Sequence, residues 1–254
     1  MGVVLTAAAD PSEVRINLGR NLTHGMLDAL GRAIVTGGYE SRNFPTEAEL
    51  ARQHGVSRSV TRESVKMLTA KGLLSARPRQ GTIVQPTTSW NLFDTDVLRW
   101  LLERKFSLQL LRHFNQLRVS IEPEAAALAA TFADDNDRRS IDAGLARMAQ
   151  AELGLDDTLD SDIAFHVAVL RASKNPFYAQ FQDVVATALR TSIRFTNRIK
   201  GRTANVADHA AVRDAIARRD ADGARLAMRG IIGDVLELID IAEHVPDPTP
   251  DGDT

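Results

Sequence analysis

The sequence contains no cysteine, and this absence excludes a disulfide framework, a thiolate metal site and a cysteine nucleophile. It also lacks any long apolar run, which argues against a membrane-spanning helix. Residues 1–10 lack the basic segment of a secretory signal, so we expect a cytoplasmic protein without a membrane partner. With 254 residues and a 44% hydrophobic composition, the chain is too apolar to be disordered. It is long enough for one large domain or two smaller ones.

A strong excess of either charge is missing too, since the formal net charge is only −2, but the charges are unevenly distributed. Residues 1–86 contain 11 basic and 7 acidic side chains, whereas residues 87–254 contain 20 basic and 26 acidic ones. The basic excess is concentrated in residues 42–85. This pattern indicates a two-part protein whose N-terminal part binds a polyanion, although a solvated basic surface would have the same composition.

The N-terminal part has the pattern of two short helices joined by a tight turn. Thr46 and Glu49 have the spacing of a capping box, Gly55 ends the first helix, and Ser57 is placed to cap the second. Two short extended segments around a Pro/Gly turn follow and predict a β-hairpin. This order is that of a winged helix-turn-helix domain, which we assign to residues 12–86. The alternative is a small structural helical domain with a basic turn.

Polar side chains gather where a winged helix-turn-helix contacts DNA. The first turns of its second helix enter the major groove, where arginine binds guanine and hydroxyls reach phosphates or bases. The basic turn of the hairpin suits phosphate or the minor groove. The predicted DNA-binding residues are Arg42, Thr46, Ser57, Arg58, Ser59, Thr61, Arg62, Arg77, Arg79, Gln80 and Gly81.

The C-terminal part lacks strand alternation and is a succession of amphipathic segments. These segments cover residues 108–133, 136–153, 157–172, 176–200, 204–219 and 220–243. The predicted fold class is therefore mainly α, with a winged helix-turn-helix followed by an all-α bundle of about six to seven helices over 108–243. We expect a linker with a short connecting helix at 87–107 and a flexible tail at 244–254.

Several of these motifs match a known signature. Phe44–Ala51, Gly55–Glu63 and Gly81–Val84 resemble the winged-helix signature of the GntR family of transcription regulators. Arg118 with Glu122, Asp162 with Phe165 and His166, Asn175-Pro176, and His209 with Arg213 resemble the effector-binding helical domain of the FadR subfamily. Residues 90–100 are similar to the matching segment of galactonate-operon repressors and related sugar-acid regulators. Those regulators share Ala48, where many family members have an arginine that can contact the operator.

The resemblance implies an effector site in the helical domain. Asp162 and His166 are four residues apart and project from one face of a helix, and with His209 they form a set able to hold zinc or another divalent ion. Metal-binding relatives have a further histidine where this chain has Ile231, so whether a metal is bound stays open. Without a metal, the two histidines could bind a hydroxylated acid directly, with Arg118 clamping its carboxylate. The predicted effector-binding set is Arg118, Asp162, His166, Arg190 and His209.

Simpler interpretations of these residues stay open at this point. Asp162 and His166 could be a helix-stabilising pair, Arg118 and Glu122 an intrahelical ion pair, and Arg190 part of a solvated helix face. We predict no enzyme, but a homodimeric, ligand-responsive repressor of a sugar-acid catabolic operon. A small hydroxy-carboxylate would release it from a palindromic operator, with residues 90–100 transmitting the change. The alternatives are a metal-dependent enzyme using the Asp/His/His set and an effector-independent architectural DNA-binding protein.

Overall fold

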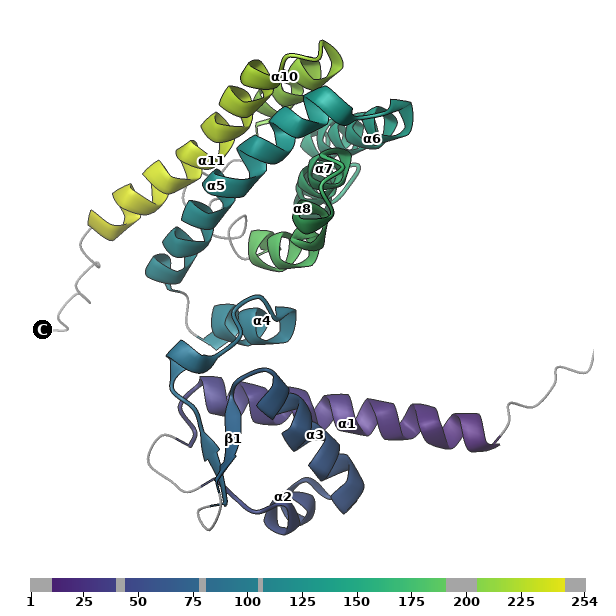
Figure 1. The fold of residues 1–254 in the computed structure, drawn as a ribbon, viewed down its shortest axis with the longest axis vertical. Coiled ribbons are helices and arrows are strands. Elements are labelled where there is room, and N and C mark those ends of the chain that lie inside the picture. Colours follow the sequence, from purple (N-terminus) through teal and green to yellow (C-terminus); the bar gives the residue numbers. More distant parts are fainter. Residues whose placement is uncertain (1–10, 40–43, 78–80, 105–106, 191–204, 245–254) are drawn as a thin grey trace, which may run out of the picture. The chain divides into compact units, whose positions relative to one another are not determined.

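The chain folds into two compact units, Met1–Lys105 and Phe106–Thr254. This computed structural model describes residues 11–39, 44–77, 81–104, 107–190 and 205–244. Figure 1 shows their helices and the single two-stranded sheet found among them. No helix in the described ranges is long and apolar enough to cross a membrane. The predicted mainly α fold class is confirmed.

The first unit contains the predicted helix-turn-helix and wing. Its elements are α1 (Pro11–Val35), α2 (Glu47–His54), α3 (Arg58–Ala70), β1 (Leu74–Arg77), β2 (Gly81–Val84), a 3-10 turn (Thr87–Ser89) and α4 (Thr95–Arg104). The strands pair antiparallel, with Leu74 opposite Val84 and Arg77 opposite Gly81. The core is built largely from leucines of α1, α2, α3 and β1, including Leu27, Leu30, Leu50, Leu68 and Leu74.

Local capping explains where α2 and α3 begin and end. Thr46 and Glu49 form the predicted capping box, in which each side chain bonds to the other residue's backbone N–H. Gly55 ends α2 with φ of 64°, in the left-handed region that favours glycine. The Ser57 side chain then accepts a hydrogen bond from the Val60 backbone N–H at the start of α3. The tight turn between the two helices is therefore fixed by residues that the sequence identifies.

Residues 87–104 pack on the helix-turn-helix within the first unit. Trp90 and Trp100 are buried in the leucine core, and Gly31 of α1 is needed there because a Cβ would lie 2.3 Å from the Trp100 ring. The Lys71 Nζ lies 2.7 Å from an Asp94 carboxylate oxygen and 2.9 Å from one of Asp96. The predicted connecting helix thus exists as α4, but it is fixed to the helix-turn-helix. The prediction that residues 90–100 transmit the effector's signal stays a prediction.

The second unit is an all-α bundle. Its helices are α5 (Leu108–Phe132), α6 (Asp135–Glu152), α7 (Thr158–Ala172), α8 (Pro176–Gln180), a helical stretch over 182–190, α10 (Val206–Ala217) and α11 (Ala221–His244). The predicted single helix over 176–200 is interrupted at Phe181, which caps the C-terminus of α8. The remainder of that prediction, beyond residue 190, lies outside the described residues.

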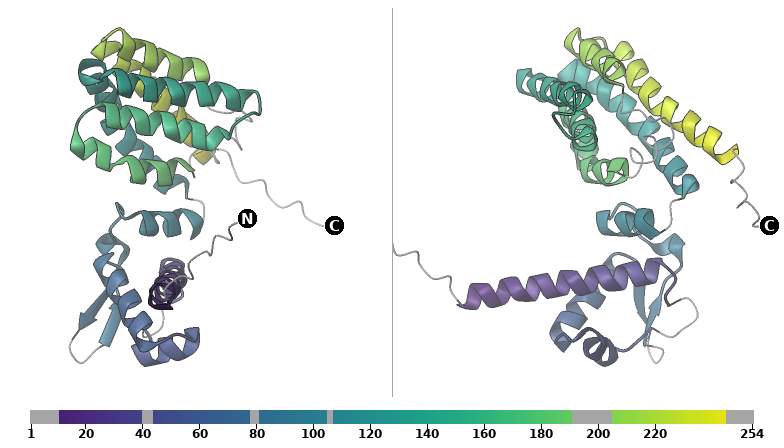
Figure 2. Two further views of the ribbon diagram at one scale, coloured as in Figure 1. Left: turned by 90° about the vertical axis from the view of Figure 1, so that its right-hand side faces the viewer. Right: turned by 180° about the vertical axis from the view of Figure 1, so that it is seen from behind.

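Helices α5 and α11 lie side by side in this bundle (Figure 1). They run antiparallel, because Arg112 of α5 pairs with Glu243 at one end and Glu124 pairs with Arg225 at the other. Helices α6 and α7 form a second packed pair, seen from two further directions in Figure 2. Between these pairs lies an apolar core that includes Ile141, Met148, Phe165, Val212 and Met228. The polar cluster described below is set into this core.

Candidate functional site

The first turns of α3 present polar side chains to solvent. Ser57, Arg58, Ser59 and Arg62 are all exposed. Arg62 Nε lies 3.3 Å from Glu47 Oε2, which orients its guanidinium across the turn between α2 and α3. Within the described ranges no carboxylate pairs with Arg58, so its five N–H donors remain free for an external acceptor. These side chains are exposed, as the prediction of a major-groove surface requires, and their contact with DNA stays a prediction.

Thr61 does not belong to that surface. Its side chain is completely buried, and its hydroxyl donates to the Ser57 carbonyl at 3.1 Å. The prediction that Thr61 contacts DNA is therefore wrong, because Thr61 shares the buried face of α3 with Ser64, Val65 and Leu68, which follow it at helical spacing. Thr46 is exposed but uses its hydroxyl in the α2 cap. Arg77 and Gly81 are exposed at the wing, and the predicted Arg42, Arg79 and Gln80 lie outside the described residues.

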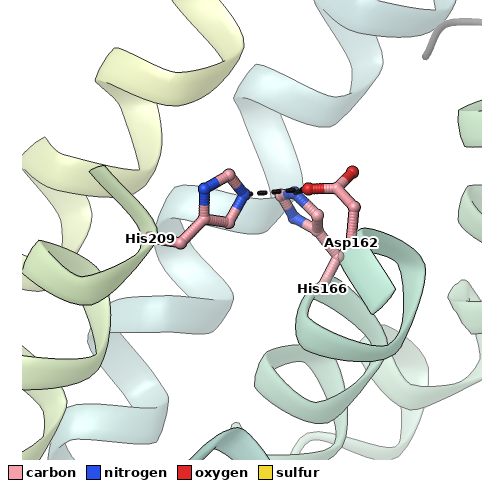
Figure 3. Close-up of side chains that lie close together, drawn as sticks. All are labelled: Asp162, His166 and His209. Atoms are coloured by element: carbon pink, nitrogen blue, oxygen red, sulfur yellow. Dashed lines mark ion pairs between the residues drawn. The ribbon is translucent and has the colours of Figure 1, made fainter. Parts of the chain in front are cut away.

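The second unit brings Asp162, His166 and His209 together (Figure 3). Two come from one face of α7 and the third from α10, and none is more than 3% exposed. Asp162 Oδ1 lies 3.0 Å from His209 Nε2 and 3.8 Å from His166 Nε2. One ligand atom from each side chain lies within 4.8 Å of the others. The structure thus assembles the ligand set that the sequence predicts.

The outer contacts of both histidines turn their Nε2 atoms toward the cluster, where His209 Nε2 has no partner among the described residues and His166 Nε2 lies 3.4 Å from Arg118 NH2. His209 Nδ1 lies 2.8 Å from the Asn205 carbonyl oxygen, which can only accept, so Nδ1 carries the hydrogen. His166 Nδ1 lies 2.6 Å from a Glu122 carboxylate oxygen, with the same consequence. In neutral imidazoles both Nε2 atoms are then lone-pair acceptors that face the Asp162 carboxylate. Acceptors facing one another need a proton or a cation between them.

Two of these buried atoms have no hydrogen-bond partner among the described residues. They are Asp162 Oδ1 and His209 Nε2, which are directed at each other. A divalent cation would satisfy both, and a carboxylate with two imidazoles is a common ligand set for zinc and related ions. The residues present therefore fit a metal ion, although one position expected to provide a ligand is Ile231. That side chain is half-buried and packs on the apolar core.

Charge also favours a cation or proton at this point. Burial alone would lower the pKa of the His209 imidazole, but the Asp162 carboxylate and the Asn205 carbonyl raise it above its usual value. Burial opposes ionisation of Asp162, yet the two imidazoles and Arg118 hold the pKa of this carboxyl below its usual range. Asp162 is thus held in its ionised form although it is buried, and a buried negative charge needs a positive partner.

A buried ion pair on α5 borders the cluster. Arg118 Nε donates to Glu122 Oε1 at 2.6 Å and its NH1 donates to Asn115 Oδ1 at 3.2 Å. Burial raises the pKa of Glu122, but Arg118 and His166 outweigh burial and lower this pKa to about 2. Arg118 is therefore in the predicted site, but its guanidinium is already engaged within the chain. The intrahelical ion pair left open by the sequence is present.

Arg190 lies outside this cluster. Its side chain is half exposed and donates to Asp160 Oδ1 at 2.8 Å, on the solvent side of α7. Including Arg190 in the effector site needs correction, because its guanidinium is exposed and paired with Asp160 at the surface instead of contacting Asp162, His166 or His209. Asn115, Glu122 and Asn205 were not among the predicted site residues. The spacing of Asn115, Arg118 and Glu122, three and four residues apart, was a signal that one helix face carries all three.

Comparison with known proteins agrees with this two-part arrangement. The family model of gntR-family bacterial regulatory proteins matches residues 25–84, and that of the FCD domain matches residues 114–234. The chain is 33% identical over 216 residues to the Escherichia coli (strain K12) regulator YieP, described as an uncharacterized HTH-type transcriptional regulator, covering 84% of this chain and 93% of YieP. The chain belongs to the GntR family. It is a transcription regulator with a winged helix-turn-helix and a FadR-type C-terminal domain.

The names of two other relatives of this GntR regulator each state an operon. It is 32% identical over 212 residues to the galactonate operon transcriptional repressor of E. coli, covering 82% of this chain and 92% of the repressor. It is 31% identical over 203 residues to the putative L-lactate dehydrogenase operon regulatory protein of E. coli, covering 73% of each chain. These matches are to regulators and not to enzymes, in agreement with the sequence prediction.

Solved structures share the fold at low sequence identity. The Listeria monocytogenes protein Lar matches with a TM-score of 0.53 at 18% identity, over 86% of this chain and 96% of Lar. E. coli McbR/YncC matches with a TM-score of 0.50 at 16% identity, over 88% of this chain and 99% of that protein. At this identity the likeness concerns the fold alone.

Proposed function

We propose that this regulator is a repressor of an operon for the breakdown of a sugar acid, and that a small 2-hydroxy-carboxylate releases it from its operator. The observation that carries the proposal is the buried Asp162–His166–His209 cluster, with two opposed acceptor atoms that need a cation. The names of two relatives support the ligand class. Galactonate and lactate are both 2-hydroxy-carboxylates, although they differ in chain length.

Asp162, His166 and His209 would hold a divalent ion, with zinc the best fit to the carboxylate and imidazole donors. When bound, the ion supplies a buried positive centre with open positions for hydroxyl and carboxylate oxygens. Ile231 contributes no ligand, so three protein side chains hold the ion and more positions remain for the effector. The acid's preference for one geometry of the protein then shifts the population away from the DNA-binding form.

On the DNA side, Arg58, Ser59 and Arg62 carry the proposed contacts of α3, with Ser57 at its N-terminus. The regulator acts in the cytoplasm as a homodimer, and the two α3 helices read the half-sites of a palindrome about one DNA turn apart. With Ala48 in place of the family arginine, α2 contributes less to base contacts. Sequence preference thus depends chiefly on α3.

A thermal-shift experiment tests the effector site. The protein is melted with a panel of aldonates and lactate, each with and without Zn²⁺, because a ligand that binds only the folded state raises the melting temperature. The Asp162→Asn variant removes the buried carboxylate with little change of shape. Asp160→Asn is the matched control, since Asp160 lies two residues earlier on the exposed face of α7.

We expect at least one acid to stabilise the wild type and the Asp160→Asn variant in the presence of Zn²⁺, and to leave the Asp162→Asn variant unchanged. Equal stabilisation of the Asp162→Asn variant would place the effector elsewhere. If no acid and no ion shifts the melting temperature of the wild type, the proposal is wrong.

A further inference from the structure

The Arg118–Glu122 pair is one of the most deeply buried charged features of the second unit. The two side chains are 2% and 1% exposed. Removing two charges from water is costly, and such a pair adds little stability compared with apolar side chains of the same size. Its retention in the core of this bundle therefore calls for a role beyond holding α5 together.

Glu122 contacts side chains of two helices, Arg118 of α5 and His166 of α7. Its Oε1 accepts from Arg118 Nε at 2.6 Å, and its Oε2 accepts from Arg118 NH2 at 3.2 Å. The same Oε2 lies 2.6 Å from His166 Nδ1, and Arg118 NH2 lies 3.4 Å from both ring nitrogens of His166. Arg118 is itself fixed by Asn115, whose side-chain amide donates to the Leu111 carbonyl at 2.9 Å. The orientation of the carboxylate at His166 is thus set by a chain of buried contacts along one helix.

We propose that Glu122 is a positioning residue for His166, and that Arg118 holds the Glu122 carboxylate and borders the His166 ring instead of clamping the effector's carboxylate. An ionised carboxylate only accepts hydrogen bonds, so it keeps the hydrogen of His166 on Nδ1 and leaves Nε2 as the atom that faces Asp162 and His209. The Asn205 carbonyl does the same for His209. The inference rests on the proposed function, because Nε2 matters only if the cluster holds an ion.

A double variant tests this without leaving a lone buried charge. Arg118→Met combined with Glu122→Leu replaces the ion pair by apolar side chains of similar volume, which often leaves stability unchanged or higher. Glu122→Gln is the second, milder variant should the double variant fail to fold. The matched control is Arg112→Gln with Glu243→Gln, which removes a more exposed ion pair between α5 and α11, away from the cluster.

Two readouts are measured on the full chain. The first is the tautomer of His166 in metal-free protein, read from long-range ¹H–¹⁵N spectra of protein labelled at histidine, with His166→Gln identifying the signal. We expect the Nδ1–H form in the wild type and the control, and its loss or mixing in the double variant. The second is Zn²⁺ affinity from competition with a chromophoric chelator, with Co²⁺ absorption as a check on the ligand environment. Here we expect a loss of about 10- to 100-fold in the double variant, an altered Co²⁺ spectrum, and no change in the control.

The two proposals fail in different ways. A folded double variant with the wild-type tautomer and wild-type Zn²⁺ affinity would overturn the positioning role, as would unchanged values in Glu122→Gln if only that variant folds. If the wild type binds neither Zn²⁺ nor Co²⁺, the metal site of the proposed function is wrong and the positioning role is overturned with it. The wild-type titration alone identifies that case.

Discussion

Asp160 and Asp162 are two residues apart on α7, and burial gives them different roles. Asp160 is half exposed and pairs with Arg190 at the surface, an arrangement that contributes about 0–1 kcal/mol. Asp162 is buried between two imidazoles, and its Oδ1 has no hydrogen-bond partner among the described residues. At the scale of single residues, Asp162 is therefore a buried carboxylate with an unpartnered oxygen, whereas Asp160 faces solvent.

On the DNA side, the corresponding prediction concerns Arg58. The Arg58→Ala change should weaken specific operator binding by about 1–3 kcal/mol, roughly 5- to 150-fold, because a bidentate arginine–guanine contact is lost. The fold should be unaffected, since the side chain is exposed and unpaired within the described ranges. Fluorescence anisotropy with labelled operator measures the affinity, and circular dichroism checks the fold.

Arg190→Ala provides the control for that experiment. It removes another exposed arginine, in the second unit, and we expect operator affinity to stay within about twofold of the wild type, since among the described residues Arg190 makes a surface ion pair with Asp160. If Arg58→Ala binds the operator as tightly as the wild type does, α3 is not the recognition helix that we describe.

Spacing was enough to predict Asp162 and His166 as neighbours, because four residues of helix return a side chain to the same face. The same spacing places Thr61 on the buried face of α3, four residues before Val65 and seven before Leu68, but its hydroxyl favoured a DNA contact. The direction of Arg190 has no such signal, because it depends on how two distant helices pack. The roles of Glu122 and Asn205 likewise depend on contacts between helices that one sequence does not specify.

At the scale of elements, α4 is the main difference from the sequence prediction. The caps and turns of α2 and α3 are local and were predicted from Thr46, Gly55 and Ser57. The position of α4 depends on contacts across about seventy residues, with Arg99 NH2 and Trp100 Nε1 both donating to Asp28, at 2.8 and 2.7 Å. Such long-range pairing has no periodic signal in the sequence.

Asp28 should make the first unit sensitive to acid. Burial raises its pKa, but the hydrogen bonds from Arg32, Trp100 and Arg99 outweigh burial and hold this pKa well below its usual value. A carboxyl with a lowered folded-state pKa stabilises the protein above its unfolded pKa of about 3.9, and this stability is lost as the pH falls further. The wild type should therefore lose melting temperature below about pH 4, and Asp28→Asn should lose less over that range.

Melting curves followed by circular dichroism at pH 7 and pH 3 measure this effect. At pH 7 we expect Asp28→Asn to melt below the wild type. The variant lacks the charged carboxylate that accepts hydrogen bonds from side chains of both α1 and α4. The control is Asp142→Asn, an exposed carboxyl of α6 whose contact with Arg213 is 3.5 Å long. The same acid-induced loss in Asp28→Asn and in the wild type would show that Asp28 does not hold α4.

Cross-linking tests whether α4 stays on α1 during the response. Arg32 and Glu103 form a surface ion pair between these helices, and the chain has no cysteine of its own. The double change Arg32→Cys and Glu103→Cys, joined by a short bismaleimide, therefore links the two helices at a single place. Operator affinity and release by the effector should match those of the unlinked double variant within about twofold.

Binding without release in the cross-linked protein would contradict this expectation. Such a result would mean that α4 separates from α1 when the effector acts, as a freely transmitting segment would. The unlinked double variant controls for the loss of the ion pair.

At the scale of the whole molecule, a net charge of −2 is divided between a basic DNA-binding part and an acidic effector-binding part. Operator affinity should depend steeply on salt, because the basic unit exchanges counterions with the phosphates. Fold class and family were predictable because helix caps, periodicity and the motifs of both units are local features. The effector's identity was not, because the stereochemistry of one hydroxyl is read by a pocket built from several helices.

The most direct test of the account is the release of labelled operator by a 2-hydroxy-carboxylate in the presence of Zn²⁺, followed by fluorescence anisotropy. We expect at least one aldonate to weaken operator binding of the wild type by tenfold or more, a coupling of about 1.4 kcal/mol. The Asp162→Asn variant should bind the operator normally and not be released. If no hydroxy acid changes operator affinity, or if the Asp162→Asn variant is released as readily as the wild type, the central claim is contradicted.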